Sequence, residues 1–282
     1  AGQVRLYAWD GSTWLQRGAD IDGEAAGDLN HRGISVSFDG SVVAIGAPSN
    51  NGNGTNAGYV RLYAWDGSSW LQRGADIDGE ATGDYSGNSV SLSSDGSVVA
   101  IGALYNDGNG TDAGHVRLYA WDGSSWAQRG ADIDGEAEGD YSGHSVSLSN
   151  DGSVVAIGAH YNDGNGSNSG QVRLYAWDGS TWLQRGADID GEAAGDLSGW
   201  SVSLSSDGSV VGIGAIFNSG NGFYPLAGHV RLYAWDGSSW AQRGADIDGE
   251  AAVDFSGNSV SLSSDGSVVA IGAHYNDGNG SN

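Results

Sequence analysis

Residues 60–66 read V-R-L-Y-A-W-D, and this string decides the fold because it returns along the whole chain. It also begins at Val4, Val116, Val172 and Val230, at spacings of 56, 56, 56 and 58 residues. The 282 residues therefore divide into five repeats, namely 1–56, 57–112, 113–168, 169–226 and 227–282. Self-similarity at a fixed period is typical of repeat architectures, in which each repeat is one supersecondary unit.

Each repeat holds four strand signals, as the second repeat shows. Segments that are β-branched, aromatic or alternating in polarity predict strands over Gly58–Asp66, Ser69–Ile77, Ser89–Ser93 and Ser97–Ala103. An Asp-Gly pair follows the first and the third of these strands. We expect these pairs to form two-residue type I′ turns, with positive φ at both central residues. No ten-residue stretch has the 3.6-residue period of a helix.

Four antiparallel strands in each of five repeats predict an all-β fold, a five-bladed β-propeller that forms one domain over residues 1–282. A β-solenoid is the alternative, but its coils are usually shorter and lack paired Asp-Gly hairpins. An open array would leave unpaired strand edges at both ends, whereas a closed ring leaves none.

The stretch G-D-Y-S-G-x-S-V-S-L-S-x-D-G-S-V-V-A-I-G-A resembles the FG-GAP repeat, the blade unit of integrin α-subunit propellers and of bacterial and algal surface proteins. The resemblance implies that S-V-S-L-S is the innermost strand of a blade and S-W-x-Q-R-G the outermost. It also implies a secreted or cell-surface protein. The integrin calcium loop is shortened here to a bare Asp-Gly turn, and five blades are fewer than seven, so that calcium site does not carry over.

This register predicts how the ring closes. The chain begins with the third and fourth strands of a blade and ends with the first and second. We therefore expect Val4–Asp10 to pair with Val268–Ala273 and to clasp the ring without a covalent bond.

Composition narrows the classes of function. The formal charge is −24, and all 11 basic residues are arginine. Such a chain is not expected to bind nucleic acid, because phosphate recognition needs a basic surface. No apolar run approaches the ~18 residues of a membrane span, so membrane insertion is not expected either. The chain has no cysteine and so no disulfide.

The loop G-A-D-I-D-G-E-A-x-G-D is the most informative motif, because it places four carboxylates within nine residues of every repeat. They are Asp20, Asp22, Glu24, Asp28, Asp76, Asp78, Glu80, Asp84, Asp132, Asp134, Glu136, Asp140, Asp188, Asp190, Glu192, Asp196, Asp246, Asp248, Glu250 and Asp254. Crowded oxygen ligands of this kind suit Ca²⁺, although the spacing is not that of an EF-hand. Two alternatives remain open: a solvated turn, and pairing with the upstream arginines Arg17, Arg73, Arg129, Arg185 and Arg243.

Two tryptophans face each other across the first hairpin of each repeat. The pairs are Trp9 and Trp14, Trp65 and Trp70, Trp121 and Trp126, Trp177 and Trp182, and Trp235 and Trp240. They are expected to pack the hairpins, with sugar stacking as the alternative.

Three positions vary between otherwise matching repeats. They are Arg32, Asn88, His144, Trp200 and Asn258; then Pro48, Leu104, His160, Ile216 and His274; then Gln3, Tyr59, His115, Gln171 and His229. All three flank the acidic loop or the N-D-G-N-G loop, which topology places on one face. Drift at tolerant loop edges and a recognition surface on a fixed frame both fit this pattern. A metal site formed by His115, His144 and His160 is a weaker possibility.

Glycosylation sequons begin at Asn53, Asn109, Asn165 and Asn279. Five copies of one motif, with no lysine or cysteine, do not indicate a unique catalytic site, so the chain is not expected to be an enzyme. We expect an extracellular or cell-surface module, structural or adhesive, that binds protein or glycan at the acidic-loop face and can self-assemble. A multivalent lectin with one weak site per blade is the alternative.

Overall fold

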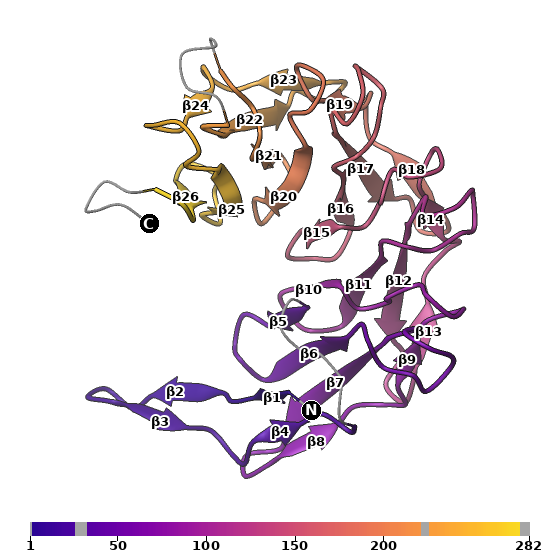
Figure 1. The fold of residues 1–282 in the computed structure, drawn as a ribbon. Coiled ribbons are helices and arrows are strands. Elements are labelled where there is room, and N and C mark those ends of the chain that lie inside the picture. Colours follow the sequence, from indigo (N-terminus) through magenta and orange to yellow (C-terminus); the bar gives the residue numbers. More distant parts are fainter. Residues whose placement is uncertain (1, 26–32, 221–225, 277–282) are drawn as a thin grey trace.

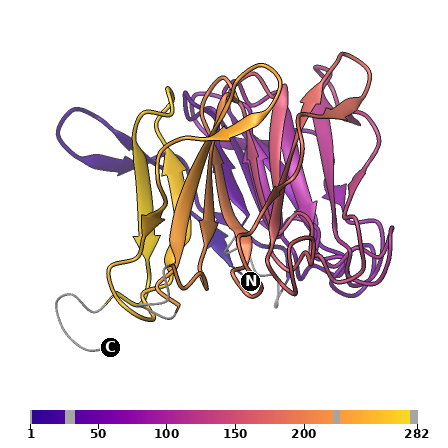
Figure 2. The same cartoon turned by 90° about the horizontal axis from the view of Figure 1, so that it is seen from above.

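The computed structural model describes residues 2–25, 33–220 and 226–276, and every regular element in them is a β-strand. Antiparallel sheets are arranged side by side around an arc (Figure 1), and the view from above shows the strands of neighbouring sheets running roughly alongside one another (Figure 2). The prediction of an all-β propeller-type fold is confirmed.

Four complete blades have the same strand order in the described residues. The first contains β5 (Ile34–Val36), β6 (Val42–Ala47), β7 (Tyr59–Trp65), β8 (Trp70–Gln72) and β9 (Ile77–Asp78). The second contains β10 (Ser89–Leu92), β11 (Val98–Ala103), β12 (His115–Trp121), β13 (Trp126–Gln128) and β14 (Ile133–Asp134). The third contains β15 (Ser145–Leu148), β16 (Val154–Ala159), β17 (Gln171–Trp177), β18 (Trp182–Gln184) and β19 (Ile189–Asp190). The fourth contains β20 (Ser198–Leu204), β21 (Val210–Ala215), β22 (His229–Trp235), β23 (Trp240–Gln242) and β24 (Ile247–Asp248).

The sequence predicted one continuous outermost strand in each repeat, and the structure shows two short strands instead. In the first complete blade, β8 pairs with the end of β7 that follows Leu62, and β9 pairs with its beginning. Gly74 lies between β8 and β9 with φ +85, a left-handed backbone that interrupts a strand. The strand therefore splits into two short pieces on the same partner.

The two ends of the chain form half-blades, and the expected clasp is absent. β1 (Gln3–Val4) pairs with β4 (Ile21–Asp22), and β2 (Tyr7–Trp9) pairs with β3 (Trp14–Gln16). β26 (Val269–Ala273) pairs only with β25 (Ser256–Leu262) among the described strands. The described ends of the chain lie apart in Figure 1, and no described strand of one half-blade pairs with a described strand of the other. Without a neighbour, the third-strand segment is broken into β1 and β2, whereas β22 is continuous.

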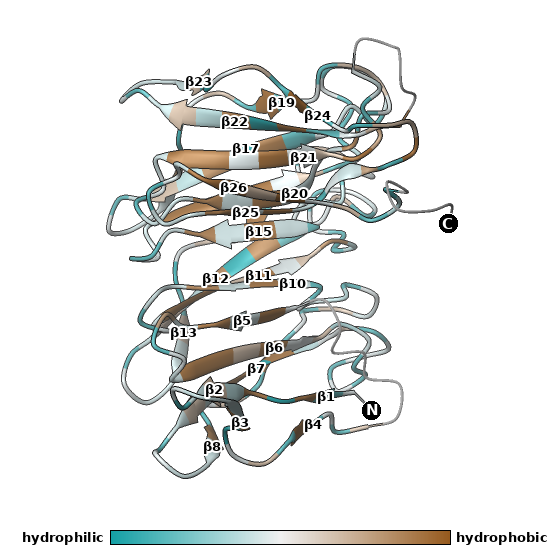
Figure 3. Cartoon of the chain, turned by 90° about the vertical axis from the view of Figure 1, so that its left-hand side faces the viewer, coloured by the Kyte–Doolittle hydropathy of each residue, from teal (hydrophilic) through white to brown (hydrophobic). Residues whose placement is uncertain are grey.

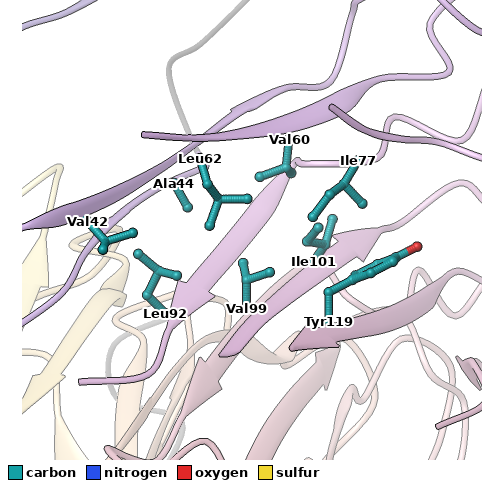
Figure 4. Packing of buried hydrophobic residues seen from close by; sticks show 9 residues of the cluster. All are labelled: Val42, Ala44, Val60, Leu62, Ile77, Leu92, Val99, Ile101 and Tyr119. Atoms are coloured by element: carbon teal, nitrogen blue, oxygen red, sulfur yellow. The ribbon is translucent and has the colours of Figure 1, made fainter. Parts of the chain in front are cut away.

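The hydrophobic core lies between blades. Side chains from β6, β7 and β9 meet side chains from β10, β11 and β12 (Figure 4). Leu62 and Ile101 are each 1% exposed in this cluster. The second strand of each complete blade is buried along its whole length because sheets cover both of its faces. Figure 3 shows these apolar bands crossing the strands, with polar residues gathered in the loops.

The hairpin turns correct the expectation of type I′ geometry. Gly96 has φ +65, but Asp95 is not among the residues with positive φ. The Gly96 N–H donates to the Ser93 carbonyl at 2.9 Å, and the Asp95 carboxylate accepts the Ser97 N–H at 2.9 Å. The aspartate therefore braces an ordinary turn with its side chain, and only the glycine needs the left-handed region.

The tryptophan pairs join successive repeats. The Trp126 indole donates to the Arg73 carbonyl at 2.7 Å, and the Arg73 guanidinium carbon lies 4.9 Å from the Trp121 ring centroid. Arg73 also donates to the Gly96 carbonyl at 2.9 Å. The same contacts recur at the next two blade junctions. These tryptophans therefore pack the junctions between blades. The arginines upstream of the acidic loops contact the tryptophans rather than the loop carboxylates.

Candidate functional site

The acidic loop and the N-D-G-N-G loop meet on one face of each blade, as the topology predicted. The Asp84 carboxylate is 3% exposed and accepts the Asn106 side-chain amide at 3.2 Å and the Ala81 N–H at 2.9 Å. The fourth carboxylate of each later loop has the same asparagine partner, in the pairs Asp140–Asn162, Asp196–Asn218 and Asp254–Asn276. Asp28, the fourth carboxylate of the first repeat, lies outside the described residues. These carboxylates hold the two loops together.

The first carboxylate of each loop accepts a glutamine amide of its own repeat. These bonds, 2.5 to 2.6 Å long, join Gln16–Asp20, Gln72–Asp76, Gln128–Asp132, Gln184–Asp188 and Gln242–Asp246. Asp76 also receives two hydrogen bonds from Arg61 at 2.8 Å, and they lower the pKa of this carboxyl below its ordinary value. Arginine pairing thus occurs, but its donors are the strand arginines of V-R-L-Y.

The second and third acidic positions lie at the junction between blades. The second positions are on short strands or next to them, at Asp22, Asp78, Asp134, Asp190 and Asp248. The backbone carbonyls of Asp78, Asp134 and Asp190 accept an arginine of the following repeat at 2.6 Å. The glutamates Glu24, Glu80, Glu136 and Glu192 pair with arginines of the following repeat. Glu250, in the fifth repeat, pairs with no arginine among the described residues.

Two groups of three side chains could hold a metal ion, and each combines two repeats. They are Glu80, His115 and Asp132, and Glu192, His229 and Asp246, with ligand atoms within 4.8 Å of one another in each group. Within the described residues, no loop brings three of its own carboxylates that close. Burial, together with the charge of Arg117, lowers the pKa of His115 to about 4, so this imidazole is neutral at pH 7.

A pocket of about 380 Å³ opens beside the channel that the innermost strands line. Its wall is mostly aromatic, with a few uncharged polar groups. The lining residues are Pro48, Ser49, Tyr85, Asn88, Leu104, Tyr105, Tyr141, His144, His160, Tyr161 and Trp200. None of these described residues carries a carboxylate or a guanidinium group.

Three variable residues meet in the wall of this pocket. The ring centroids of His144 and His160 are 4.0 Å apart, and Trp200 lies 4.7 Å from His144 and 5.1 Å from His160. Two of the three variable positions therefore contribute to one pocket. The third does not, because His115 lies at the blade junction beside Glu80, so the three histidines do not gather. Arg32 lies outside the described residues.

Sequence reasoning did not single out the tyrosines of the pocket. Tyr105 contacts Tyr85 and Tyr141 edge-on, with centroids 5.2 Å apart in both pairs. Tyr85 and Tyr141 have φ of 53 and 54, a left-handed backbone that bulky residues rarely adopt. The signal for them in the sequence was the recurrence of a tyrosine beside the Gly-Asp and Asn-Asp motifs. Backbone strain at such positions is often a feature of binding sites.

The sequons Asn53, Asn109 and Asn165 lie on exposed loops, and each side-chain amide donates to a glycine carbonyl at 2.7 to 2.8 Å. Asn279 lies outside the described residues. Glycosylation stays a prediction at all four.

A family model described as FG-GAP repeat matches residues 77–119 and 132–175. Two segments of the chain thus match the FG-GAP repeat. Both matches span an acidic loop, a strand hairpin and the following V-R-L-Y strand, which confirms the resemblance noted from the sequence. No curated protein matches the sequence.

Two solved structures share the fold of this FG-GAP repeat chain. The periplasmic gluconolactonase of Pseudomonas aeruginosa has a TM-score of 0.60 and 18% identity, with 95% of this chain and 70% of that chain covered. The hydrazine synthase of Kuenenia stuttgartiensis has a TM-score of 0.55 and 12% identity, with 89% of this chain and 57% of that chain covered. At these identities, the likeness shows the fold alone.

The comparison corrects one prediction. Five copies of one motif were expected to exclude an enzyme, and that prediction is wrong, because the fold is shared by proteins named as enzymes, among them these two. The physical reason lies in this pocket, where His144 and Trp200 each occur once at a position that differs between repeats, and histidine at the His160 position returns only as His274. A repeated backbone can therefore carry one site that is built from side chains that differ between repeats. No helix in the described residues is long and apolar enough to cross a membrane.

Proposed function

We propose that this FG-GAP repeat propeller is an extracellular carbohydrate-binding module with one main site, the aromatic pocket at the channel mouth. The observation that carries the proposal is the wall of tyrosines, Trp200 and paired histidines around a volume of about 380 Å³. Ligand pockets in proteins are typically of this size, apolar, and furnished with a few polar groups.

The chemistry of the pocket favours a neutral, hydroxyl-rich ligand with apolar faces. Aromatic rings offer flat surfaces against which the C–H face of a sugar ring can pack. Asn88, Ser49 and the tyrosine hydroxyls supply donors and acceptors at the rim. Because the described lining has no charged side chain, it gives no reason to prefer a phosphate, a carboxylate or a metal ion.

The pocket is held in place before any ligand arrives. The Tyr85 hydroxyl accepts the Asn56 side-chain amide at 3.0 Å, and the Tyr85 N–H donates to the Asn56 carbonyl at 3.0 Å. Pre-organisation of this kind reduces the entropy lost on binding. It supports one defined site in place of one weak site per blade.

A glycan array probed with the full chain tests the proposal. Neutral glycans should bind, and Trp200→Ala should lose that binding. Trp14→Ala is the matched control, because Trp14 is 64% exposed on the N-terminal hairpin, far from the channel mouth in sequence. Equal binding by both variants would place the glycan site elsewhere.

A second candidate is an enzyme that acts on a sugar-derived substrate in the same pocket. Two imidazoles 4.0 Å apart are groups that can move protons near neutral pH. A structure that shares the fold is named a gluconolactonase. Hydrolysis of gluconolactone by the wild type, lost in His160→Gln, would favour this candidate over simple binding.

A third candidate is the structural or adhesive module predicted from the sequence, which the half-blades support. β26 has a free edge, and β2 is exposed along its length. We propose that the two half-blades pair within one chain, which completes the fifth blade and closes the ring. Pairing between chains would instead build filaments, and the cross-linking prediction in the Discussion separates these outcomes.

Calcium binding by the acidic loops stays a proposal. It is supported by the excess of carboxylates, but most first and fourth carboxylates already have protein partners. A rise in melting temperature with millimolar CaCl₂, absent with NaCl at matched ionic strength, is the expected result if calcium binds. Superimposed melting curves in EGTA and in calcium would show that these loops are solvated turns.

A further inference from the structure

We infer that Glu80–His115–Asp132 and Glu192–His229–Asp246 are two equivalent sites for a zinc-type divalent metal ion, each joining neighbouring repeats. One imidazole and two carboxylates form a mixed nitrogen and oxygen ligand set, which suits Zn²⁺ and related transition ions. A water molecule can take the fourth position. Calcium fits less well because it prefers oxygen ligands alone.

The histidines supply a second observation that points to a ligand. The His229 side chain is 1% exposed, and neither of its ring nitrogens has a hydrogen-bond partner in the described structure. His115 is equally buried; its Nε2 has no such partner there, while its Nδ1 is the nitrogen that faces Glu80, so the unpartnered Nδ1 of His229 carries this observation. Buried polar atoms without partners are rare because they cost free energy.

The distances fit coordination better than hydrogen bonding. His229 Nδ1 lies 3.8 Å from Glu192 Oε2, and His115 Nδ1 lies 3.8 Å from Glu80 Oε2. These separations are too long for a hydrogen bond. Two ligands of one tetrahedral zinc ion are about 3.4 Å apart, given bonds of about 2.0–2.2 Å. A small rotation of either glutamate closes the difference.

The surroundings allow a metal ion to enter. The side chains of Glu80 and Glu192 are 46% and 42% exposed, so each site opens to solvent on the glutamate side. Arg117 and Arg231 approach the other glutamate oxygen, Oε1, at 3.6 and 3.9 Å. The positive charge of each arginine opposes the binding of a cation. The other glutamate oxygen, Oε2, still faces the histidine.

The same position in the other blades provides an internal comparison. Gln171 replaces the histidine between the third and fourth repeats, and its amide donates to Glu136 Oε2 at 3.0 Å. The side chain of Tyr59 occupies the position in the second repeat, where Arg61 pairs with Glu24 and Asp76. In these two blades the glutamate is already satisfied. The long glutamate–histidine contact is confined to the two histidine repeats.

Zinc titration of the full chain by isothermal calorimetry tests the inference. We expect two equivalents of Zn²⁺ per chain, a higher melting temperature on binding, and no competition from a millimolar excess of Ca²⁺. His115→Gln with His229→Gln should lose both equivalents, since removing a ligand lowers affinity by more than ~100-fold. Because Gln171 occupies the same position naturally, this variant is expected to fold, and its melting curve without zinc checks that it does.

Two further variants sharpen the result. Gln171→His should add a third equivalent beside Glu136 and Asp188. His144→Gln with His160→Gln should keep both equivalents, because these residues lie in the aromatic pocket. Absence of zinc binding, or two equivalents retained by the His115→Gln, His229→Gln variant, would overturn the inference.

Discussion

The guanidinium carbon of Arg129 lies 4.9 Å from the ring centroid of Trp177, in the following repeat. The Trp182 indole donates to the Arg129 carbonyl at 2.6 Å, and the Arg129 side chain donates to the Gly152 carbonyl at 2.9 Å. One arginine thus joins two repeats through its backbone, its charge and its planar face. This contact recurs at four junctions and explains the two tryptophans on the first hairpin of the second to fifth repeats.

Arg129→Ala should lower the free energy of unfolding by about 2–3 kcal/mol, because it removes a cation–π contact and a charged hydrogen bond. Arg129→Lys should recover part of this loss, since a lysine keeps the charge but not the planar stacking. Urea denaturation of the three proteins measures the effect. Equal stability of the alanine variant and the wild type would show that the stack is incidental.

Closure of the ring can be tested at the equivalent positions of the two half-blades. In the first complete blade Ala44 pairs with Leu62, which corresponds to Ala270 and Leu6 at the chain ends. The chain has no cysteine, so Leu6→Cys with Ala270→Cys should form one internal disulfide and migrate as a compact monomer on a non-reducing gel. A ladder of oligomers would show that the half-blades pair between chains, and free thiols would show an open arc.

Arg243 allows a second, independent test of whether the ring is closed. It has no following tryptophan pair, whereas Trp9 and Trp14 are 55% and 64% exposed and have no preceding arginine. In a closed ring Arg243→Ala should destabilise the protein about as much as Arg185→Ala does. An effect of less than ~0.5 kcal/mol would indicate that the ring stays open.

The two glycine turns of one repeat should respond differently to alanine. Gly67 has φ +104 and open space around a new Cβ, so Gly67→Ala should cost about 1 kcal/mol from backbone strain alone. At Gly96, with φ +65, a Cβ would lie 2.6 Å from the Val42 Cβ of the neighbouring blade. Gly96→Ala should therefore cost about 1–3 kcal/mol more. Equal melting temperatures for the two variants would contradict the close packing at Gly96.

Stability should fall in acid between pH 4 and pH 2. Hydrogen bonds from the N–H groups of Ser68 and Ser69 lower the pKa of Asp66 to about 2, from an ordinary value of 3.8. Because the folded pKa lies below the unfolded one, the stabilisation is present above pH 4 and is lost as the pH falls through 2. Asp178 has the same environment. Asp66→Asn with Asp178→Asn should flatten the pH dependence of the unfolding free energy, and an unchanged slope would argue against these turns as its source.

The sequence predicted the repeated frame well because the frame depends on local signals. The Asp-Gly pairs, the apolar V-V-A-I-G-A strand and the alternating S-V-S-L strand each form their elements within one repeat. The shared face of two loops also followed from strand order, and the Asp84–Asn106 hydrogen bond confirms it.

Contacts between repeats could not be predicted from local sequence patterns. Arg117 reaches the carbonyl of Asp78, 39 residues earlier, and Trp126 reaches that of Arg73, 53 residues earlier. Such pairs depend on the angle between blades, which no single repeat encodes. The same holds for Tyr105, which contacts Tyr85 of its own repeat and Tyr141 of the following repeat.

Stoichiometry of glycan binding tests the central claim most directly. A neutral glycan selected on the array is titrated into the full chain by isothermal calorimetry, with Trp200→Ala and Trp14→Ala measured alongside. One site at the channel mouth predicts one glycan per chain for the wild type and for Trp14→Ala, and a loss of affinity of at least ~10-fold for Trp200→Ala, about 1.4 kcal/mol. Several equivalents per chain, or an affinity unchanged by Trp200→Ala, would contradict the channel-mouth site.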